Sequence, residues 1–312
     1  MYEWISKLTG NSPAVRRLAA VCGWLPRPVT LALLHFAALL LYMLAGSRII
    51  GRIAANMKDL LPQRREAGIR RYTRQYLANV VISLYEILID SQRLSETGAG
   101  RFIVRGEQYL RDVLREGRGA IVFTPHTGNF FYYYWYLTKS YNCLTVATGG
   151  SPELRPLYEK FQAMGCPGLD YDSVPPLELL RRLKKHLEAG GIVFLLGDFW
   201  RPAFPLSEMF GRTTRSPEGA ALLSIEQKAA VIPFYGRRVH GFTHELVFES
   251  PLPLYERFTR KQRGEATRLL NRFMEKVIRL HPEQWFYWFN AEERWERETA
   301  GWNDDASPAQ TG

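Results

Sequence analysis

The chain contains few cysteines, which limits the kinds of structure that it can form. Only Cys22, Cys143 and Cys166 occur among its 312 residues. Their number is odd and their spacing differs from that of a metal-ligand set, so neither a disulfide framework nor a zinc site is expected. A reducing, cytosolic setting fits this cysteine content best.

Internal repeats and low-complexity linkers are also missing from the sequence. A chain of 312 residues of which 46% are apolar is long enough for one large domain with a sizeable core. We therefore expect a single domain over residues 51–298, preceded by an N-terminal membrane anchor over residues 1–50. Residues 299–312 are polar and contain glycine and proline, which predicts a disordered tail.

No zinc-finger or RNP pattern occurs, although the chain is basic. It has 41 Lys and Arg against 31 Asp and Glu, a formal net charge of +10. Proteins of this charge bind nucleic acid, anionic lipid headgroups or acidic proteins. Because the basic residues are scattered among hydrophobic segments, we expect a membrane surface or an acidic protein as partner, and no nucleic acid.

One long apolar run, residues 29–46, is broken only by Thr30 and His35. Its length is the lower limit for spanning a bilayer, and it also suits a helix that lies in the membrane interface. A buried core helix is the alternative. A cleaved signal peptide is not expected, because the run starts late and no convincing cleavage site follows. More basic residues follow the run than precede it, which predicts a cytosolic position for the domain.

The segment 119–130 combines a short strand with a histidine. Five apolar or β-prone residues end at Pro125, and His126 then enters a Thr-Gly-Asn turn. A histidine at the carboxyl end of a central strand is well placed for a general base, whereas the simpler interpretation is a structural histidine. The aromatic run 130–137 that follows predicts a helix, which either packs on the sheet or lines a channel for an acyl chain.

A second buried strand, residues 191–197, ends at Asp198. Further strands are predicted at 144–148, 231–235 and 246–248, and helices at 60–94, 107–116, 152–164, 176–189, 218–228 and 261–280. Buried strands separated by helices predict an α/β fold with a mixed, mostly parallel central sheet flanked by helices. His126 and Asp198 then lie at the same edge of this sheet, where ligands bind in such folds.

A loop is predicted for residues 209–219, with Ser216 capping the next helix and Pro217 in its first turn. Arg212 and Arg215 lie beside this helix start. Exposed amides, the helix dipole and guanidinium groups together bind phosphate, so the two arginines are candidates for a phosphate site. The alternative is that they are solvated loop residues.

Taken in order, these segments resemble conserved blocks of the bacterial lipid A late acyltransferases, the lauroyl and myristoyl transferases of the glycerol-phosphate acyltransferase superfamily. The first block is Gly-x-Gly-Ala-Ile-Val-Phe-x-x-His126-x-Gly128-Asn129, and Asp198 resembles the aspartate that ends the strand of a later block. The remaining blocks are Phe210-Gly211, Pro217-x-Gly219, residues 230–234 and Pro282-Glu283-Gln284-Trp285-x-x-Trp288.

This resemblance implies a transferase that moves an acyl group from an acyl carrier protein, or another acyl thioester donor, to a hydroxyl or amine. The acceptor would be a lipid or glycolipid at the cytoplasmic face of the bacterial inner membrane. No cofactor or metal is expected. With the residues considered above, the candidate site residues are the base His126 with Asp198, and the substrate-binding residues Gly128, Asn129, Arg212, Arg215, Glu218 and Gly219.

The chain departs from the family pattern at one position of the first block. The family carries an acid after four residues, as His-x-x-x-x-Asp/Glu, and this chain has Phe131 there. Asp198 is the strongest substitute for this acid, and Glu218 is the second. A basic run that usually follows the last block is also replaced, by residues 289–294. Two interpretations stay open. The first is an active transferase that moves a fatty or aminoacyl group from a carrier-protein thioester to a membrane or secondary-metabolite acceptor. The second is a catalytically impaired relative that binds carrier protein or lipid as a scaffold.

Overall fold

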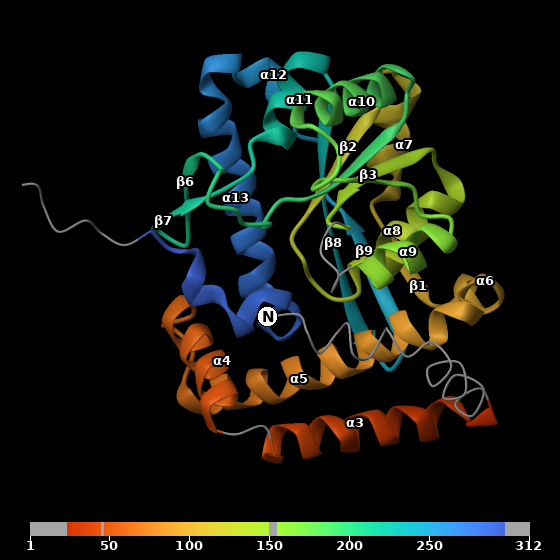
Figure 1. Cartoon of the computed structure of the whole chain (residues 1–312), viewed down its shortest axis with the longest axis vertical. Helices are drawn as coiled ribbons and strands as arrows, with labels where there is room; N and C mark the ends of the chain where they lie inside the picture. The colour runs from red at the N-terminus through yellow and green to blue at the C-terminus, as the bar shows by residue number, and fades with distance from the viewer. Residues whose placement is uncertain (1–23, 45–46, 150–154, 297–312) are drawn as a thin grey trace, which may run out of the picture.

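A computed structural model describes residues 24–44, 47–149 and 155–296 of the chain (Figure 1). Within them, the main sheet has seven strands in the order β1-β9-β8-β2-β5-β3-β4. Neighbouring strands run parallel except β8 and β9, which confirms the mixed, mostly parallel sheet. The strands are β1 Phe102–Arg105, β2 Ala120–Thr124, β3 Cys143–Ala147, β4 Gly168–Asp170, β5 Ile192–Leu196, β8 Ala230–His240 and β9 Thr243–Phe248.

Strand β2 lies at the centre and separates two hydrophobic cores. All five of its residues are buried, as expected for a strand covered on both faces. Ala120 and Val122 pack with α7, α8 and α9, whereas Ile121 and Phe123 pack with α10, α11 and α13. These helices are α7 Glu107–Arg115, α8 Phe130–Ser140, α9 Arg155–Ala163, α10 Pro176–Glu188, α11 Gly219–Gln227 and α13 Arg263–Leu280.

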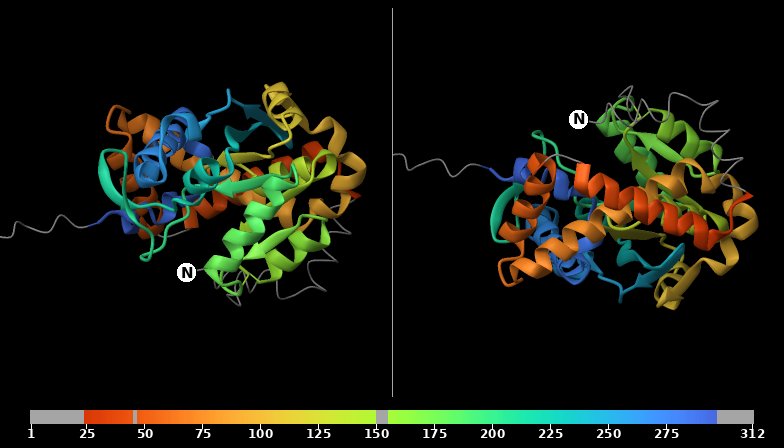
Figure 2. Two further views of the ribbon diagram at one scale, coloured as in Figure 1. Left: turned by 90° about the horizontal axis from the view of Figure 1, so that it is seen from above. Right: turned by 90° about the horizontal axis from the view of Figure 1, so that it is seen from below.

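Three helices near the N-terminus lie together at one end of the molecule: α3 Arg27–Leu44, α4 Ser47–Leu60 and α5 Glu66–Leu88. Helix α3 runs alongside α5 at the lower end of Figure 1, and the view from below in Figure 2 shows the same arrangement. Thr30 and Ala38 are the buried residues of α3, so the core-helix interpretation is wrong. By length and composition α3 could cross a bilayer. The first 23 residues of the expected anchor, Cys22 and the tail 299–312 lie outside the described residues.

Two of the predicted boundaries need correction. The single helix expected over residues 60–94 is shorter. Helix α5 begins only at Glu66, because the chain turns at residues 61–65, which include Pro62, and it ends at Leu88. The loop expected over residues 209–219 instead overlaps a hairpin of β6 Leu206–Met209 and β7 Arg212–Arg215. Its turn uses Phe210 and Gly211, both at positive φ. These strands are short and partly exposed, so they lack the apolar pattern that reveals a buried strand.

The start of α11 also differs from the prediction. Glu218 occupies the N-cap position, without a side-chain cap hydrogen bond, and Pro217 precedes it. The hydroxyl of Ser216 instead lies 3.0 Å from the side-chain nitrogen of Asn271 on α13. Ser216 therefore joins the hairpin region to α13 and does not cap α11.

After α13, three short 3-10 segments bring the end of the described chain back to the sheet: Pro282–Gln284, Phe286–Phe289 and Ala291–Arg294. Trp285 lies between the first two segments and Trp288 lies within the second, and both side chains are fully buried. The backbone of Phe286 donates to the carbonyl of His126 at 2.8 Å, and Gly128 donates to the carbonyl of Gln284 at 2.9 Å. The Pro-Glu-Gln-Trp block therefore holds the loop that carries His126.

Candidate active site

His126 and Asp198 meet at the carboxyl edge of the sheet because β2 and β5 are neighbouring parallel strands. The backbone N–H of His126 donates to both carboxylate oxygens of Asp198 at 3.0 Å. Ring atom Nδ1 of His126 lies 2.6 Å from Oδ1 of the same carboxylate. Both residues are buried, with 9% of His126 and 4% of Asp198 exposed. The structure thus joins the two candidates that the sequence placed at one sheet edge.

Asp198 is held in its charged form by several neighbours. The Trp285 indole donates to Oδ2 at 2.7 Å, and Arg294 donates to the backbone carbonyl of Asp198 at 2.5 Å. Burial on its own would raise the pKa of the Asp198 carboxyl, but His126, Arg294 and Trp285 outweigh it and hold that pKa below its usual range. A carboxylate at Nδ1 keeps the proton on that nitrogen, which leaves Nε2 as the atom able to accept another.

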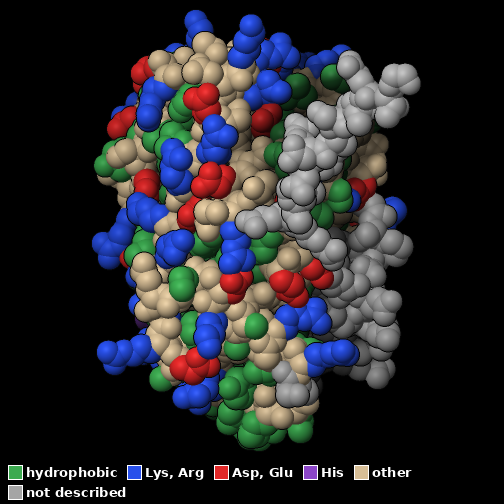
Figure 3. All heavy atoms as spheres, turned by 90° about the vertical axis from the view of Figure 1, so that its left-hand side faces the viewer, with side chains coloured by type: hydrophobic (Ala, Val, Ile, Leu, Met, Phe, Trp, Pro, Cys, Tyr) green, Lys and Arg blue, Asp and Glu red, His purple; other side chains and the backbone are tan. Residues whose placement is uncertain are grey.

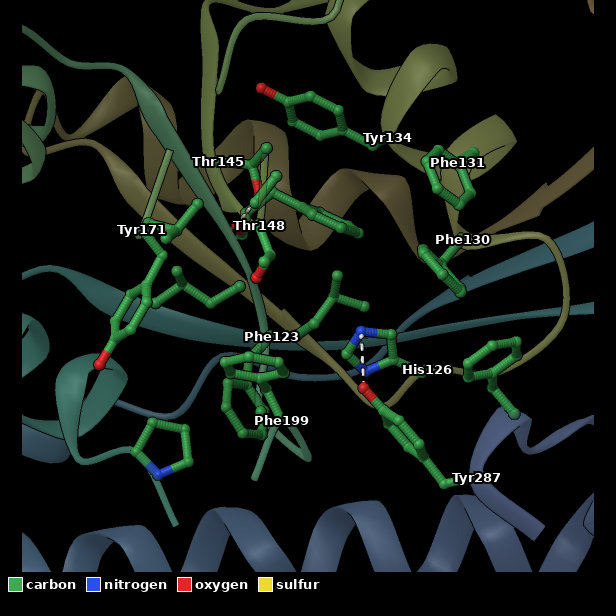
Figure 4. Close-up of a pocket in the computed structure, with 18 of the residues that line it drawn as sticks. Phe123, His126, Phe130, Phe131, Tyr134, Thr145, Thr148, Tyr171, Phe199 and Tyr287 are labelled. Atoms are coloured by element: carbon green, nitrogen blue, oxygen red, sulfur yellow. Dashed lines mark hydrogen bonds between the residues drawn. The ribbon is translucent and has the colours of Figure 1, made fainter. Parts of the chain in front are cut away.

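A cavity of about 440 Å³ adjoins His126, and its walls are mostly apolar. Figure 4 shows the His126 ring at this cavity, with Phe130 and Phe131 on one side and Phe123 and Phe199 on another. The aromatic segment of α8 both lines this cavity and packs in the core. Phe130, Phe131 and Tyr134 line the cavity, whereas Tyr132, Tyr133 and Trp135 are buried in the core.

Phe131 occupies the position where the family carries an acid, and it forms part of the cavity wall. Its ring stacks on Phe130 with centroids 4.7 Å apart and meets the edge of Phe161 at 5.3 Å. An acid at this position would be surrounded by aromatic rings on these sides. The carboxylate that contacts His126 in this chain therefore follows β5 and does not lie on α8.

Tyr287 was not identified from the sequence, although it lies beside the imidazole. Its hydroxyl is 3.5 Å from Nε2 of His126, as the dashed line in Figure 4 marks. The two rings meet edge to face with centroids 4.9 Å apart. The Arg294 guanidinium lies 3.7 Å from the centre of the tyrosine ring. The only available signal was that Tyr287 falls within the Pro-Glu-Gln-Trp-x-x-Trp block.

Gly128 and Asn129 shape the loop after His126. Gly128 lines the cavity at a φ of 57°, and a Cβ there would collide with the hydroxyl of Tyr133. Asn129 is 1% exposed and caps α8 by accepting from the backbone of Tyr132 at 3.3 Å. Its side-chain amide donates to Glu86 at 2.9 Å. Asn129 therefore joins the start of α8 to Glu86 and does not line the cavity.

Glu86 of α5 is the centre of a buried polar network that supports this loop. Arg238 of β8 donates to both of its oxygens at 2.8 and 2.6 Å, and Nε2 of His244 on β9 lies 2.9 Å away. Burial opposes ionisation, but the charges and hydrogen bonds of Arg238 and His244 hold the pKa of Glu86 far below its usual range. The backbone N–H of Arg238 also donates to the side-chain oxygen of Gln284, and the side-chain amide of Gln284 donates to the backbone carbonyl of Arg238.

The four remaining candidates lie apart from the imidazole. Glu218 and Gly219 line the cavity, but the Glu218 carboxylate pairs with Arg263 at 2.6 Å. Arg212 pairs with Asp59 through two bonds of 2.6 Å, and Arg215 pairs with Glu296 at 2.5 Å. Neither arginine lines the cavity. Phosphate binding by these arginines stays a prediction, and it requires that a ligand displace the two carboxylates.

The thiols of the described cysteines are not suited to nucleophilic catalysis. Cys143 and Cys166 are free and buried. Burial raises the pKa of both thiols to about 12, which keeps them protonated near neutral pH. Among the described residues, no group of three His, Cys, Asp or Glu side chains could hold a metal ion.

Comparison with known proteins places the chain among acyltransferases. The family model described as bacterial lipid A biosynthesis acyltransferase matches residues 14–296. The phosphatidylinositol mannoside acyltransferase of Mycolicibacterium smegmatis is 29% identical over 198 residues, which make up 61% of this chain and 60% of that protein. The enzyme of the same name from Mycobacterium tuberculosis is 30% identical over 140 residues, 42% of each chain.

These matches span less than two thirds of the length of each relative. Among solved structures, the 1-acyl-sn-glycerophosphate acyltransferase from Thermotoga maritima matches 81% of this chain and 99% of its own. Its sequence identity is 13% and the TM-score is 0.37.

Proposed function

Since the chain belongs to the bacterial lipid A biosynthesis acyltransferase family, we propose that it transfers an acyl group from a thioester donor to a hydroxyl or amine of a lipid or glycolipid acceptor. The observation that carries this proposal is the contact of 2.6 Å between Nδ1 of His126 and Asp198, beside an apolar cavity. A non-catalytic scaffold has no need of a base aimed into its cavity, so this pair supports catalysis over the scaffold interpretation.

In the proposed reaction, Nε2 of His126 takes the proton of the acceptor hydroxyl while its oxygen attacks the thioester carbonyl. The resulting tetrahedral intermediate collapses, the C–S bond breaks, and the thiolate takes the proton back from the imidazolium. Asp198 fixes the tautomer and stabilises the imidazolium that forms between these steps. The apolar cavity accommodates the hydrocarbon part of the acyl group and keeps water away from the reacting carbonyl.

For the donor, we propose an acyl carrier protein, because its acidic recognition helix would complement a chain of net charge +10. Purified protein mixed with acyl-loaded carrier protein and a glycolipid acceptor should release free thiol, at a rate that falls as salt is raised. Coenzyme A thioesters of the same acyl group serve as the matched donor. Equal rates with both donors at all salt concentrations would contradict a role for the carrier protein surface.

We also propose that the protein attaches to the cytoplasmic face of the bacterial inner membrane through α3. Its outward side carries exposed apolar side chains, among them Leu33, Phe36, Met43 and Leu44. Figure 3 shows hydrophobic side chains gathered at the lower end of the molecule, where α3 lies, with Lys and Arg side chains around them. An apolar helix face flanked by basic residues suits the surface of an anionic bilayer.

Replacing Leu33 and Phe36 together by aspartate should lower binding to vesicles that contain phosphatidylglycerol. These side chains are 52% and 58% exposed, so their loss should not disturb the core. Burying one such side chain is worth about 1.5–3 kcal/mol, so we expect binding to the vesicles to weaken by about tenfold or more. The measurement is flotation with vesicles.

The matched control is Leu177→Asp on α10, at the opposite end of the molecule, whose side chain is 84% exposed. It should float with vesicles as well as the unchanged protein does. Equal flotation of all three proteins would exclude α3 as the membrane contact.

A further inference from the structure

The proposed transfer creates a negative charge on the oxygen of the thioester carbonyl, and a hydrogen-bond donor at that position speeds such reactions. Building on the proposed function, we infer that the hydroxyl of Tyr287 is this donor. Tyr287 is then a catalytic residue that stabilises the oxyanion of an acyl thioester during its attack by the acceptor.

The backbone of the His126 loop has no free N–H group to offer. His126 donates to Asp198, and Thr127 donates to the carbonyl of Pro125 at 2.8 Å. Gly128 donates to the carbonyl of Gln284, and Asn129 donates to the hydroxyl of Tyr133 at 3.0 Å. All four amides therefore hold the loop in shape and are not available for an oxyanion.

Most polar side chains of the cavity are also engaged elsewhere. The hydroxyl groups of Tyr76, Tyr134 and Tyr158 donate to backbone carbonyls at 2.8, 2.5 and 3.0 Å. Thr145 donates to the carbonyl of Phe194 at 2.6 Å, and Asn79 donates to that of Glu283 at 3.0 Å. These groups build the walls, so a donor for the reaction has to come from closer to the imidazole.

Tyr287 lies at that place. Because Asp198 holds the proton on Nδ1 of His126, Nε2 is an acceptor, and the Tyr287 hydroxyl at 3.5 Å donates to it. When the acceptor hydroxyl binds to Nε2, it takes over this hydrogen bond. The phenol proton is then directed to the thioester carbonyl, which must lie next to the attacking oxygen.

The position of Tyr287 is fixed from behind. Arg294 lies over its ring at 3.7 Å and is itself bonded to the carbonyl of Asp198. A cation on a ring face restrains the ring, and its charge favours donation by the hydroxyl. Arg294 therefore links the tyrosine to the same aspartate that orients His126.

In this scheme Tyr287 never gives up its proton. The new C–O bond forms as the carbonyl π electrons move to oxygen, where the phenol O–H bonds to them. They return as the C–S bond breaks, and the thiolate takes the proton that His126 removed from the acceptor. Tyr287→Phe removes only the hydroxyl and keeps the ring.

The test compares initial rates of acyl transfer by the full-length protein and its Tyr287→Phe variant, with acyl-loaded carrier protein and a glycolipid acceptor. We expect kcat to fall by about 10²–10³, the usual loss for one oxyanion donor, while KM for both substrates changes little. Tyr109→Phe is the matched control, because Tyr109 is exposed on α7 and outside the cavity. It should keep the full rate.

Each other outcome overturns the inference. An unchanged kcat means that the oxyanion is stabilised elsewhere, and a raised KM with unchanged kcat means that Tyr287 only binds the ground state. In both cases the proposed function stands if turnover still depends on His126. No turnover by the unchanged protein, or equal turnover by His126→Ala, overturns the proposed function and this inference together.

Discussion

Asp198→Asn is expected to lose acyl transfer almost as severely as His126→Ala, with each rate falling by about 10²–10⁴. The alanine variant lacks the base. The asparagine variant keeps the size of the side chain but presents an amide to Nδ1, 2.6 Å away in the unchanged protein, and so favours the wrong tautomer. Because the two residues act as one unit, the double variant should lose little more than either single variant. Steady-state rates of thiol release measure all three.

Phe131→Glu offers a second check on this pair. It recreates the family spacing of histidine and acid, so it should restore part of the rate of Asp198→Asn. Glu159→Gln, on the exposed face of α9 and paired with Arg155, is the control and should keep full activity. A fully active Asp198→Asn protein would exclude the orienting role of Asp198.

Glu86→Gln should lower the free energy of unfolding by about 3–5 kcal/mol, the usual effect of breaking a buried ion pair. Glu86 is fully buried, and its loss leaves the buried guanidinium of Arg238 without its carboxylate. It also weakens the contact of Asn129 that positions the His126 loop. Urea unfolding at neutral pH measures this change, and Glu159→Gln should give a much smaller one because its ion pair is exposed.

The same residue predicts how stability depends on pH. The pKa of Glu86 is lower in the folded state than its value of about 4.3 in an unfolded chain. Below that pH the unfolded chain takes up a proton that the folded protein does not, so stability present above about pH 4.3 is lost as the pH falls further. The Gln variant should lack this contribution to the acid slope. An identical slope in both proteins would contradict it.

The pairing of His126 with Asp198 could be predicted from the sequence, because each residue follows a strand that a local apolar pattern reveals. Two buried strands, each ending at a polar residue, are visible as apolar runs, and their parallel arrangement brings those ends together. The same runs predicted the central sheet. The hairpin β6–β7 was missed, since exposed strands of four residues carry no such pattern.

The partners of this pair could not be predicted, because they come from distant parts of the chain. Tyr287 reaches His126 across 161 positions, and Glu86 reaches Asn129 across 43. A tyrosine in an aromatic segment and a glutamate in a long helix look like core and surface residues respectively. Only the tertiary contacts show that one faces the imidazole and that the other is buried beneath α8.

We propose a reaction in which His126, oriented by Asp198, is the base for the transfer of an acyl group to a lipid. Its most direct test follows radiolabelled acyl groups from carrier protein into extractable lipid, with the unchanged protein and His126→Ala at equal concentrations and equal folded fractions. We predict label in the lipid with the unchanged protein and a loss of about 10²–10⁴ in its rate of appearance with the variant. Equal labelling by both proteins, or label that remains on the carrier in both, would contradict the claim.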